Sequence, residues 1–362
     1  MPVDHRLERQ SVLRLALEAE GLDAMLVTHL PNIRYLTGFT GSAALLLINA
    51  GAAMLISDFR YSSQAMTEAG SIARVEIDQR SVWDRLGRLL SATPPEALGI
   101  EAHVLTVRDA ERVSGMTRGR VVPTTELIER QRASKSAEEV ASIRAAANLA
   151  QDALAEVLPA VRPGRTEAEV GALLEAALRR RGSEWHPFPT IVASGPRSAL
   201  PHARTSQRAI ASGELLLLDF GAQVDGYCAD LTRTVVVGAR ADERQRAMHD
   251  LVQTAQRRAI QHLRAGMPAK DGDALARDVI AGRGFGDAFG HSLGHGLGLE
   301  VHEAPRLAPT SDAPLPSDAV VTVEPGVYFP GWGGIRLEDD LYLGKDGPER
   351  LSDGRTELLE LV

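Results

Sequence analysis

Two pairs of acidic residues have the types and spacing of a metal-binding cluster. The first pair, Asp219 and Asp230, lies in LLLLDFGAQVDGYCADLTRTVVV, which reads as two strands around a turn at Val224-Asp225. A turn centred there places the two carboxylates directly opposite one another, with Cβ atoms roughly 5 Å apart. Two unit charges at that separation repel by roughly 3 kcal/mol at an effective dielectric of about 20. We therefore expect a proton or a cation between them.

The second pair shows the same arrangement downstream. Glu324 and Glu338 occur in VTVEPGVYFPGWGGIRLEDD, where strand-like ends flank a loop rich in Pro and Gly. Their midpoint falls on Gly331, so an odd-length turn again sets the two carboxylates opposite each other. The sequence predicts two hairpins that each contribute two acids.

The glycine-rich stretch FGHSLGHGLGLEVHE adds His291, His295 and His302. Two Asp, two Glu and one His carry four negative charges, which two divalent ions neutralise, and an imidazole nitrogen favours a transition metal over calcium. A phosphate loop would end in G-K-[ST], and a zincin helix requires H-E-x-x-H, whereas His302-Glu303 is followed by Ala-Pro-Arg. The other histidines without such a context are expected in structural or surface roles: His5, His29, His103, His186, His249 and His262.

The first third of the chain alternates helix-like and strand-like segments. An amphipathic helix is expected from about Asp4 to Glu20, and a second helix over 81–90. Strands are expected at AMLVTH, ALLLINA, AMLISD, RVEID and LGIE. At 362 residues the chain is long enough for two domains, and this pattern predicts an α/β domain over residues 1–129.

The remaining residues, 130–362, begin with a charged linker over 130–140 that leads into a helix. Ser136 with Glu139, and Thr166 with Glu169, form two capping boxes, and the second opens a helix that ends at Gly182. A third long helix is expected over about 242–265, among strands rich in Leu and Val. We expect antiparallel sheet covered by helices in this domain, and the α+β class for the whole chain.

Composition and charge exclude several classes of function. The chain has 44% hydrophobic and 24% charged residues, as globular proteins do. A net charge of −8 without a Lys/Arg-rich run disfavours nucleic-acid binding, and no apolar run approaches the roughly 20 residues of a membrane span. The single cysteine, Cys228, and the lack of a secretory leader pattern predict a cytoplasmic protein.

Five motifs together carry a family resemblance: LDFG, DGYCADLTRT, SLGHGLGLEVHE, VEPGVY and GIRLEDD. Their order and spacing resemble the creatinase and methionine aminopeptidase superfamily of pita-bread hydrolases, and within it the proline-specific peptidases. NIRYLTGFTGS and SDFRYSSQA resemble the leading domain of these peptidases. The resemblance covers nearly the whole chain. It implies an N-terminal creatinase-like α/β domain followed by a pita-bread catalytic domain, and also a homodimer, because the leading domain of one subunit helps to close the other subunit's active site in such relatives.

The resemblance implies a role for each residue of the site. The implied ligands of two divalent metal ions, manganese first and cobalt or zinc as alternatives, are Asp219, Asp230, His295, Glu324 and Glu338, with Asp230 and Glu338 bridging both ions. Other implied roles fall to His202 at the substrate or tetrahedral intermediate, His302 at the scissile bond, His291 in proton relay, and Arg336 in orienting the acids or meeting a substrate carboxylate. Glu324 is also the expected proton carrier to the departing nitrogen. One departure is Arg197 in SGPRSALPH, where Asn is common.

The implied activity is hydrolysis of a peptide with proline at P1′, by an Xaa-Pro dipeptidase (prolidase) or by an Xaa-Pro aminopeptidase, which uses the same metal motifs. Compact length and Arg336 as a carboxylate partner favour the dipeptidase. A metal-independent creatinase-like hydrolase or a non-catalytic binding module would have lost ligand positions, and here all five are present. No organic cofactor is expected.

Overall fold

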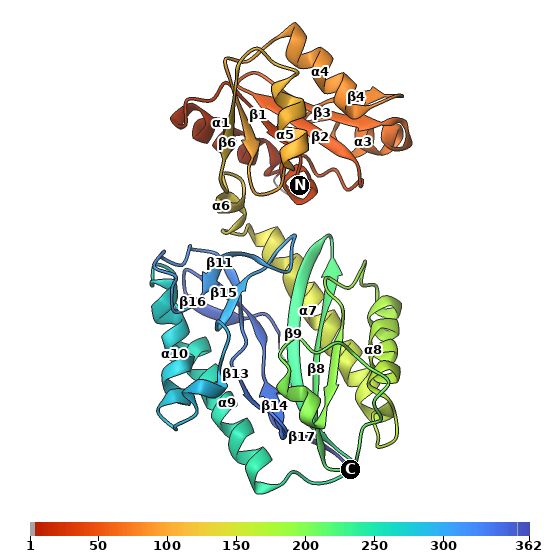
Figure 1. The fold of residues 1–362 in the computed structure, drawn as a ribbon, viewed down its shortest axis with the longest axis vertical. Coiled ribbons are helices and arrows are strands. Elements are labelled where there is room, and N and C mark those ends of the chain that lie inside the picture. The colour runs from red at the N-terminus through yellow and green to blue at the C-terminus, as the bar shows by residue number, and fades with distance from the viewer. Residues whose placement is uncertain (1–3, 353) are drawn as a thin grey trace. The chain divides into compact units, whose positions relative to one another are not determined.

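The computed structural model describes residues 4–352 and 354–362, which divide into two compact units (Figure 1). The first unit ends at Arg132 and the second covers Ala133–Val362. Within the described ranges, no helix combines the length and the apolar character that crossing a membrane requires.

The first unit is a mixed six-stranded sheet with strand order β4-β3-β2-β1-β5-β6. Its strands are β1 (Ala24–Val27), β2 (Ala44–Asn49), β3 (Ala53–Asp58), β4 (Arg74–Asp78), β5 (Ala97–Glu101) and β6 (Arg120–Thr124). Its helices are α1 (Arg6–Ala19), α2 (Leu30–Thr37), α3 (Ser62–Ala69), α4 (Val82–Ala92), α5 (Val107–Ser114) and the short α6 (Glu129–Arg132), with a 3₁₀ turn η1 (Phe59–Tyr61). The first helix, the five strands and the helix over 81–90 that we predicted are confirmed.

Four α-helices cover the second unit: α7 (Ala137–Val157), α8 (Glu167–Arg181), α9 (Glu243–His262) and α10 (Ala269–Ala281). Both predicted capping boxes are present, at Ser136 and at Thr166, and each satisfies backbone N–H groups that the first turn of a helix leaves free. Gly182 ends α8 in the left-handed conformation, with φ of 107°. The predicted third helix is α9, whose first turn is capped by Asp242.

The strands of the second unit form three sheets. One has the order β17-β9-β8-β7 and contains β7 (Ile191–Ser194), β8 (Glu214–Val224), β9 (Tyr227–Val237) and β17 (Leu359–Leu361); another has the order β11-β10-β12-β15-β16 and contains β10 (Gly294–Gly296), β11 (Glu303–Leu307), β12 (Val320–Val323), β15 (Asp339–Gly344) and β16 (Gly347–Arg350). The ribbon β13 (Gly326–Phe329) and β14 (Gly333–Arg336) is the third. Short 3₁₀ turns are η2 (Leu158–Ala160), η3 (Gly195–Ala199) and η4 (Gly286–Ala288). Every pairing is antiparallel except that of β17 with β9.

Helices α7 and α8 lie along the sheet that contains β8 and β9, as Figure 1 shows. Ala146, Ala147, Ala150 and Ala153 of α7 belong to one buried apolar cluster together with Leu174 of α8 and Phe220 of β8. A second cluster joins α9 and α10 to β12, β14 and β15. Burial of these apolar faces holds the sheets together, and the residues predicted to carry chemistry lie on the strands and on the loops that adjoin them.

The hairpin of β8 and β9 has a different register from the one we predicted. Its turn is Asp225-Gly226, with φ of 50° and 78°, a two-residue geometry whose twist matches that of the strands. Asp219 therefore pairs with Thr232, and Asp230 pairs with Gly221. The prediction that the two aspartates are directly opposite was wrong, although the offset of two positions leaves them on the same face as diagonal neighbours.

The second predicted pairing is confirmed. Strand β12 ends with Val323 paired to Asp339. The ladder of β13 and β14 begins with Gly326 paired to Arg336, so it continues the same alignment of the two chain segments. Glu324 and Glu338 occupy the opposed positions between these two ladders. The turn contains Gly331 with φ of 82°, a conformation that glycine adopts without a steric cost.

Candidate metal centre and active site

A cavity of about 1010 Å³ in the second unit brings the predicted chemical residues together. Its lining includes all of them: His202, Asp219, Asp230, His291, His295, His302, Glu324, Arg336 and Glu338. These side chains come from β8, β9, β10 and β14 and from segments next to η3, η4, β11, β12 and β15. The backbone bridge between Thr232 and Glu338 joins the two hairpins, so residues more than 100 positions apart in the sequence meet in one site.

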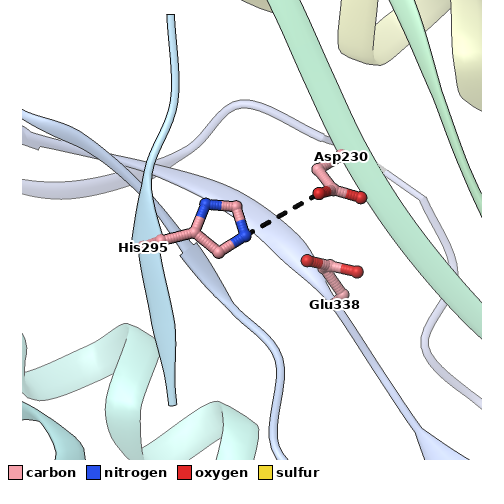
Figure 2. Close-up of side chains that lie close together, drawn as sticks. All are labelled: Asp230, His295 and Glu338. Carbon is pink, nitrogen blue, oxygen red and sulfur yellow. Dashed lines mark ion pairs between the residues drawn. The ribbon is translucent and has the colours of Figure 1, made fainter. Parts of the chain in front are cut away.

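Three of the side chains form a compact group of donor atoms (Figure 2). Asp230, His295 and Glu338 each offer one ligand atom, and these atoms lie within 4.8 Å of one another. His295 Nε2 is 3.9 Å from Asp230 Oδ2 and 3.4 Å from Glu324 Oε1. The backbone N–H of Glu338 donates to the Thr232 carbonyl at 3.1 Å, which ties β9 to the segment that carries the glutamate.

The His295 ring is oriented for ligation. Its Nδ1 lies 3.0 Å from the Gly296 carbonyl oxygen, which can only accept, so Nδ1 carries the proton. The lone pair of Nε2 then faces the acids. Burial, together with the neighbouring His302, lowers the pKa of His295 to about 4, so the ring is neutral at pH 7.

Four carboxyl groups crowd this centre and resist ionising together. At each of the four carboxyl groups, burial is the largest cause of a raised pKa. At Asp219 the Arg336 guanidinium opposes this effect, because a nearby positive charge lowers the pKa. Repulsion from neighbouring carboxylates adds to burial at Asp230 and Glu338, whose pKa values lie well above the ordinary range. The pKa of Glu324 is raised to about 7. A group of acids in this condition needs protons or cations to balance it.

The donor set fits divalent cations on structural grounds. Asp230 Oδ1 is buried and has no hydrogen-bond partner in the described part of the chain. A buried carboxylate oxygen without a donor costs free energy unless something else compensates its charge. Oxygen-rich ligands with a single imidazole are those preferred by hard and borderline divalent metals.

Two threonines hold the glutamates in place. Thr232 Oγ1 donates to Glu338 Oε2 at 2.6 Å, and Thr322 Oγ1 donates to Glu324 Oε1 at 3.2 Å. Our reading of the sequence did not single them out. Thr322 is two residues before Glu324, and Thr232 is two residues after Asp230. Because side chains alternate between the two faces of a strand, each threonine lies on the same face as the acid two positions away. That alternation is the signal by which they could have been found.

Arg336 is fully enclosed in the site. Its guanidinium donates to Asp219 Oδ2 at 2.5 Å, to Thr232 Oγ1 at 3.1 Å, to the Tyr328 hydroxyl at 2.9 Å and to the Pro201 carbonyl at 3.2 Å. The side chain is 4% exposed. This arrangement makes Arg336 a counter-charge and a brace for the acids.

Tyr328 extends this network to His291. The His291 Nδ1 proton is donated to the Ser292 carbonyl at 2.9 Å, so its Nε2 accepts from the Tyr328 hydroxyl, also at 2.9 Å. Burial and the nearby Arg336 lower the pKa of His291 to about 4. A continuous chain of hydrogen bonds therefore runs from His291 through Tyr328 and Arg336 to Asp219. The sequence reading missed Tyr328, since a tyrosine in a strand usually packs.

His202 and His302 face the cavity from loops. The His302 ring centroid is 4.3 Å from that of His295. Neither His202 nor His302 makes a side-chain hydrogen bond among the described residues, so both rings are available to a substrate. Arg204 and Arg306 also line the cavity and are exposed. No acceptor in the described ranges engages either guanidinium.

Comparison with known proteins adds independent findings. The model of metallopeptidase family M24 matches residues 141–345, and that of the Creatinase/Prolidase N-terminal domain matches residues 9–134. The chain is 41% identical over 349 residues to "Uncharacterized peptidase YqhT" of Bacillus subtilis, covering 94% of this chain and 96% of the relative.

Two solved structures resemble the whole chain. "Xaa-Pro dipeptidase from Bacillus anthracis" has a TM-score of 0.95 and 38% identity, with 98% of this chain and 100% of that chain covered. X-Pro aminopeptidase from Thermotoga maritima MSB8 has a TM-score of 0.89 and 35% identity, with 97% of this chain and 99% of that chain covered. The likeness extends over both units.

Proposed function

The chain belongs to metallopeptidase family M24 and is a hydrolase, and from that premise we propose that it cleaves the peptide bond before proline as an Xaa-Pro dipeptidase with two divalent metal ions. One observation carries the proposal. Five donor residues converge in a single cavity whose remaining walls supply histidines and two free arginines.

The proposed ligands are Asp219, Asp230, His295, Glu324 and Glu338. Asp230 and Glu338, which the family resemblance assigns to both ions, would hold them together with His295, since the donor atoms of these three residues lie within 4.8 Å of one another. When bound, two divalent ions supply Lewis acidity and lower the pKa of a water towards about 7. Carboxylates with a single imidazole favour manganese, with cobalt or zinc as alternatives.

The other side chains of the cavity have roles that do not require ligation. We assign to His202 the donation of a hydrogen bond to the oxyanion that develops at the carbonyl before proline. Glu324 is the proton carrier to the departing nitrogen, and His302 orients that step. The chain from His291 to Asp219 keeps Arg336 and the acids in one arrangement.

Recognition of the substrate's C-terminal side distinguishes a dipeptidase from an aminopeptidase. The free carboxylate of a C-terminal proline needs an accessible cation, and Arg204 and Arg306 are exposed in the cavity wall. Arg336 already donates to four acceptors, so we assign it to orienting the acids. Proline lacks an N–H, and its selection rests on ring shape and not on an amide donor.

The proposal extends to a cytoplasmic homodimer. Cys228 is free and buried, which suits a reducing compartment. The likeness of residues 9–134 to the Creatinase/Prolidase N-terminal domain supports a dimer in which the leading domain of one subunit helps to close the partner's active site.

The test is hydrolysis of Ala-Pro beside Ala-Pro-Ala after chelation and return of manganese, cobalt or zinc. A charge-assisted pair with the dipeptide carboxylate contributes roughly 1.5 to 3 kcal/mol, and a tripeptide loses that charge at proline. We expect Ala-Pro to be favoured by about 10- to 150-fold in kcat/KM. Equal or better cleavage of Ala-Pro-Ala moves the assignment to aminopeptidase, the activity named for the Thermotoga maritima structure. No cleavage of either peptide by the metal-loaded protein overturns the proposal.

A further inference from the structure

The orientation of His202 depends on the loop that carries it. The imidazole makes no hydrogen bond to a described residue, although it lines the cavity. Two backbone contacts hold the nearby chain: Leu200 N–H donates to the Arg197 carbonyl at 3.0 Å, and Ala203 N–H donates to the Leu200 carbonyl at 3.1 Å. The position of the ring must therefore be set by what fixes the loop as a whole.

Glu167, at the start of α8, fastens both ends of this loop. Its side chain is fully buried. Oε1 accepts from the Ser194 N–H at 2.8 Å and the Ser194 hydroxyl at 2.9 Å. Oε2 accepts from the Ser206 N–H at 3.1 Å and the Ser206 hydroxyl at 2.6 Å. One carboxylate thus closes the segment 194–206, with His202 inside it.

Arg197 completes the clamp from within the loop. Its Nε lies 3.2 Å and 3.1 Å from the two Glu167 carboxylate oxygens, and it neutralises a charge that has no access to water. Its Nη2 donates to the carbonyl of Arg204, two residues beyond His202. The planar guanidinium therefore joins the beginning and the end of the loop, which a lysine ammonium cannot do with the same geometry.

The opposite side of the loop is attached to the metal-binding side of the cavity. Ser198 Oγ accepts from the Gly334 N–H of β14 at 2.8 Å, and the Pro201 carbonyl accepts from Arg336 at 3.2 Å. On the other side, the Glu167 carboxylate holds Ser194 and Ser206, Arg197 donates to that carboxylate, and the Arg208 guanidinium donates to the Ser194 hydroxyl at 2.6 Å. Without the Glu167–Arg197 contact, the ends of the loop keep the contacts of Ser194 with Arg208 and of Ser206 with the Ala168 N–H, but the part of the loop around His202 loses its tie to Glu167.

We propose that Glu167 and Arg197 form a positioning pair that holds His202 in its catalytic orientation. Neither residue touches the reacting atoms, and their effect on turnover passes through His202. The inference rests on the proposed function, in which His202 stabilises the oxyanion. It also gives a purpose to the arginine at 197, which departs from the residue common in the family.

The experiment compares Arg197→Gln with a matched control, Arg181→Gln. Arg181 is also in the second unit, pairs through Nε with Glu156 at 3.0 Å, and is 36% exposed against 30% for Arg197. Misplacement of a catalytic group by about 1 Å costs up to about 100-fold in rate, so Arg197→Gln should lower kcat for Ala-Pro by about 10- to 100-fold with KM unchanged. Arg181→Gln should keep the wild-type kcat, and Arg197→Lys should recover part of the loss.

A double-mutant cycle with His202→Ala separates positioning from general damage. If Arg197 acts through His202, adding Arg197→Gln to His202→Ala lowers kcat by less than about twofold, since coupled residues are non-additive. A further loss as large as in the wild-type background overturns the proposal, and so does unchanged kcat in the single variant. Should Arg197→Gln fail to fold, Arg197→Lys enters the same cycle, with thermal melting recorded for every variant.

A spectroscopic arm keeps this inference separate from the peptidase assignment. The Cε1–H resonance of His202 is assigned in the metal-free protein by its loss in His202→Ala. It should shift or broaden in Arg197→Gln and stay unchanged in Arg181→Gln. An unaltered His202 resonance in Arg197→Gln overturns the positioning role. Failure of the wild-type protein to cleave either peptide would instead count against the proposed function.

Discussion

Nη2 of Arg336 lies 2.5 Å from Oδ2 of Asp219, and both side chains are buried in the second unit. This pair places one fixed positive charge among four carboxyl groups. Removing one partner of a buried ion pair leaves an uncompensated charge, which is far more costly than losing an exposed pair. Arg336 is therefore better suited to keeping the acids in place than to capturing a substrate.

Arg336→Lys tests that distinction. Lysine keeps the charge but cannot donate to Asp219, Thr232, Tyr328 and Pro201 together, so we expect kcat to fall by about 10-fold or more while the preference for Ala-Pro over Ala-Pro-Ala persists. In Arg306→Gln we expect the reverse, a loss of that preference with a smaller change in kcat. Specificity constants for both peptides decide the matter. Loss of the dipeptide preference in Arg336→Lys alone would return the carboxylate role to Arg336.

Metal content is the direct test of the ligand assignment. Asp230→Ala and Glu338→Ala should each bind fewer than two metal ions and lose activity, because the proposed bridging carboxylates hold both ions. The fold should survive, since both changes relieve repulsion between buried acids. Elemental analysis of the dialysed proteins gives the stoichiometry.

Asp225→Ala is the matched control for these variants. Asp225 belongs to the same hairpin as Asp230 but lies in its turn, outside the cavity lining. It should keep both metal ions and the wild-type kcat. Two bound ions with near-normal turnover in Asp230→Ala or Glu338→Ala would refute the assignment.

The two loop histidines should behave differently from the ligands. His202→Ala and His302→Ala should retain both ions and lose turnover by about 100-fold or more, the usual effect of removing an oxyanion or orienting group. His262→Ala, at the exposed end of α9, serves as the control and should retain activity. A folded His202 or His302 variant that loses metal would place that histidine among the ligands.

Local sequence rules predicted the elements that present the site. The capping boxes at Ser136 and Thr166 specify helix starts through contacts three residues apart, and Gly182 marks a helix end through its own backbone freedom. The register of Glu324 and Glu338 also follows from a local feature, the glycine-containing turn halfway between them. Such signals require no knowledge of the rest of the fold.

The features that the sequence could not predict depend on contacts between residues far apart in the chain. The hairpin of Asp219 and Asp230 turns at Asp225-Gly226, one position beyond the centre we assigned, and that shift changes the partner of every residue in the ladder. The four contacts of Arg336 come from β8, β9, β13 and the loop after η3, and only Tyr328 is near Arg336 in sequence. Glu167 looked like the first residue of an ordinary helix, and only the packed loop shows what it binds.

His249 provides a prediction about stability that is independent of the site. It lies on α9, is 1% exposed, and its Nε2 has no hydrogen-bond partner in the described part of the chain. Burial lowers its pKa from about 6.5 to about 4, so the native protein holds the neutral ring. A lowered histidine pKa means that the unfolded chain binds the proton more tightly. The contribution of His249 to stability is therefore fully present above about pH 6.5 and is lost as the pH falls towards 4.

The change is measurable by urea denaturation of the metal-free protein at about pH 7.5 and about pH 5. With these pKa values, His249 alone should remove about 2 kcal/mol from the free energy of unfolding between the two conditions. His249→Gln carries no titrating group, so its loss on acidification should be smaller than that of the wild-type protein by this amount. His262→Gln, which removes an exposed histidine from the same helix, should retain the wild-type loss. An equal drop in wild type and His249→Gln would show that the acid sensitivity of the fold arises elsewhere.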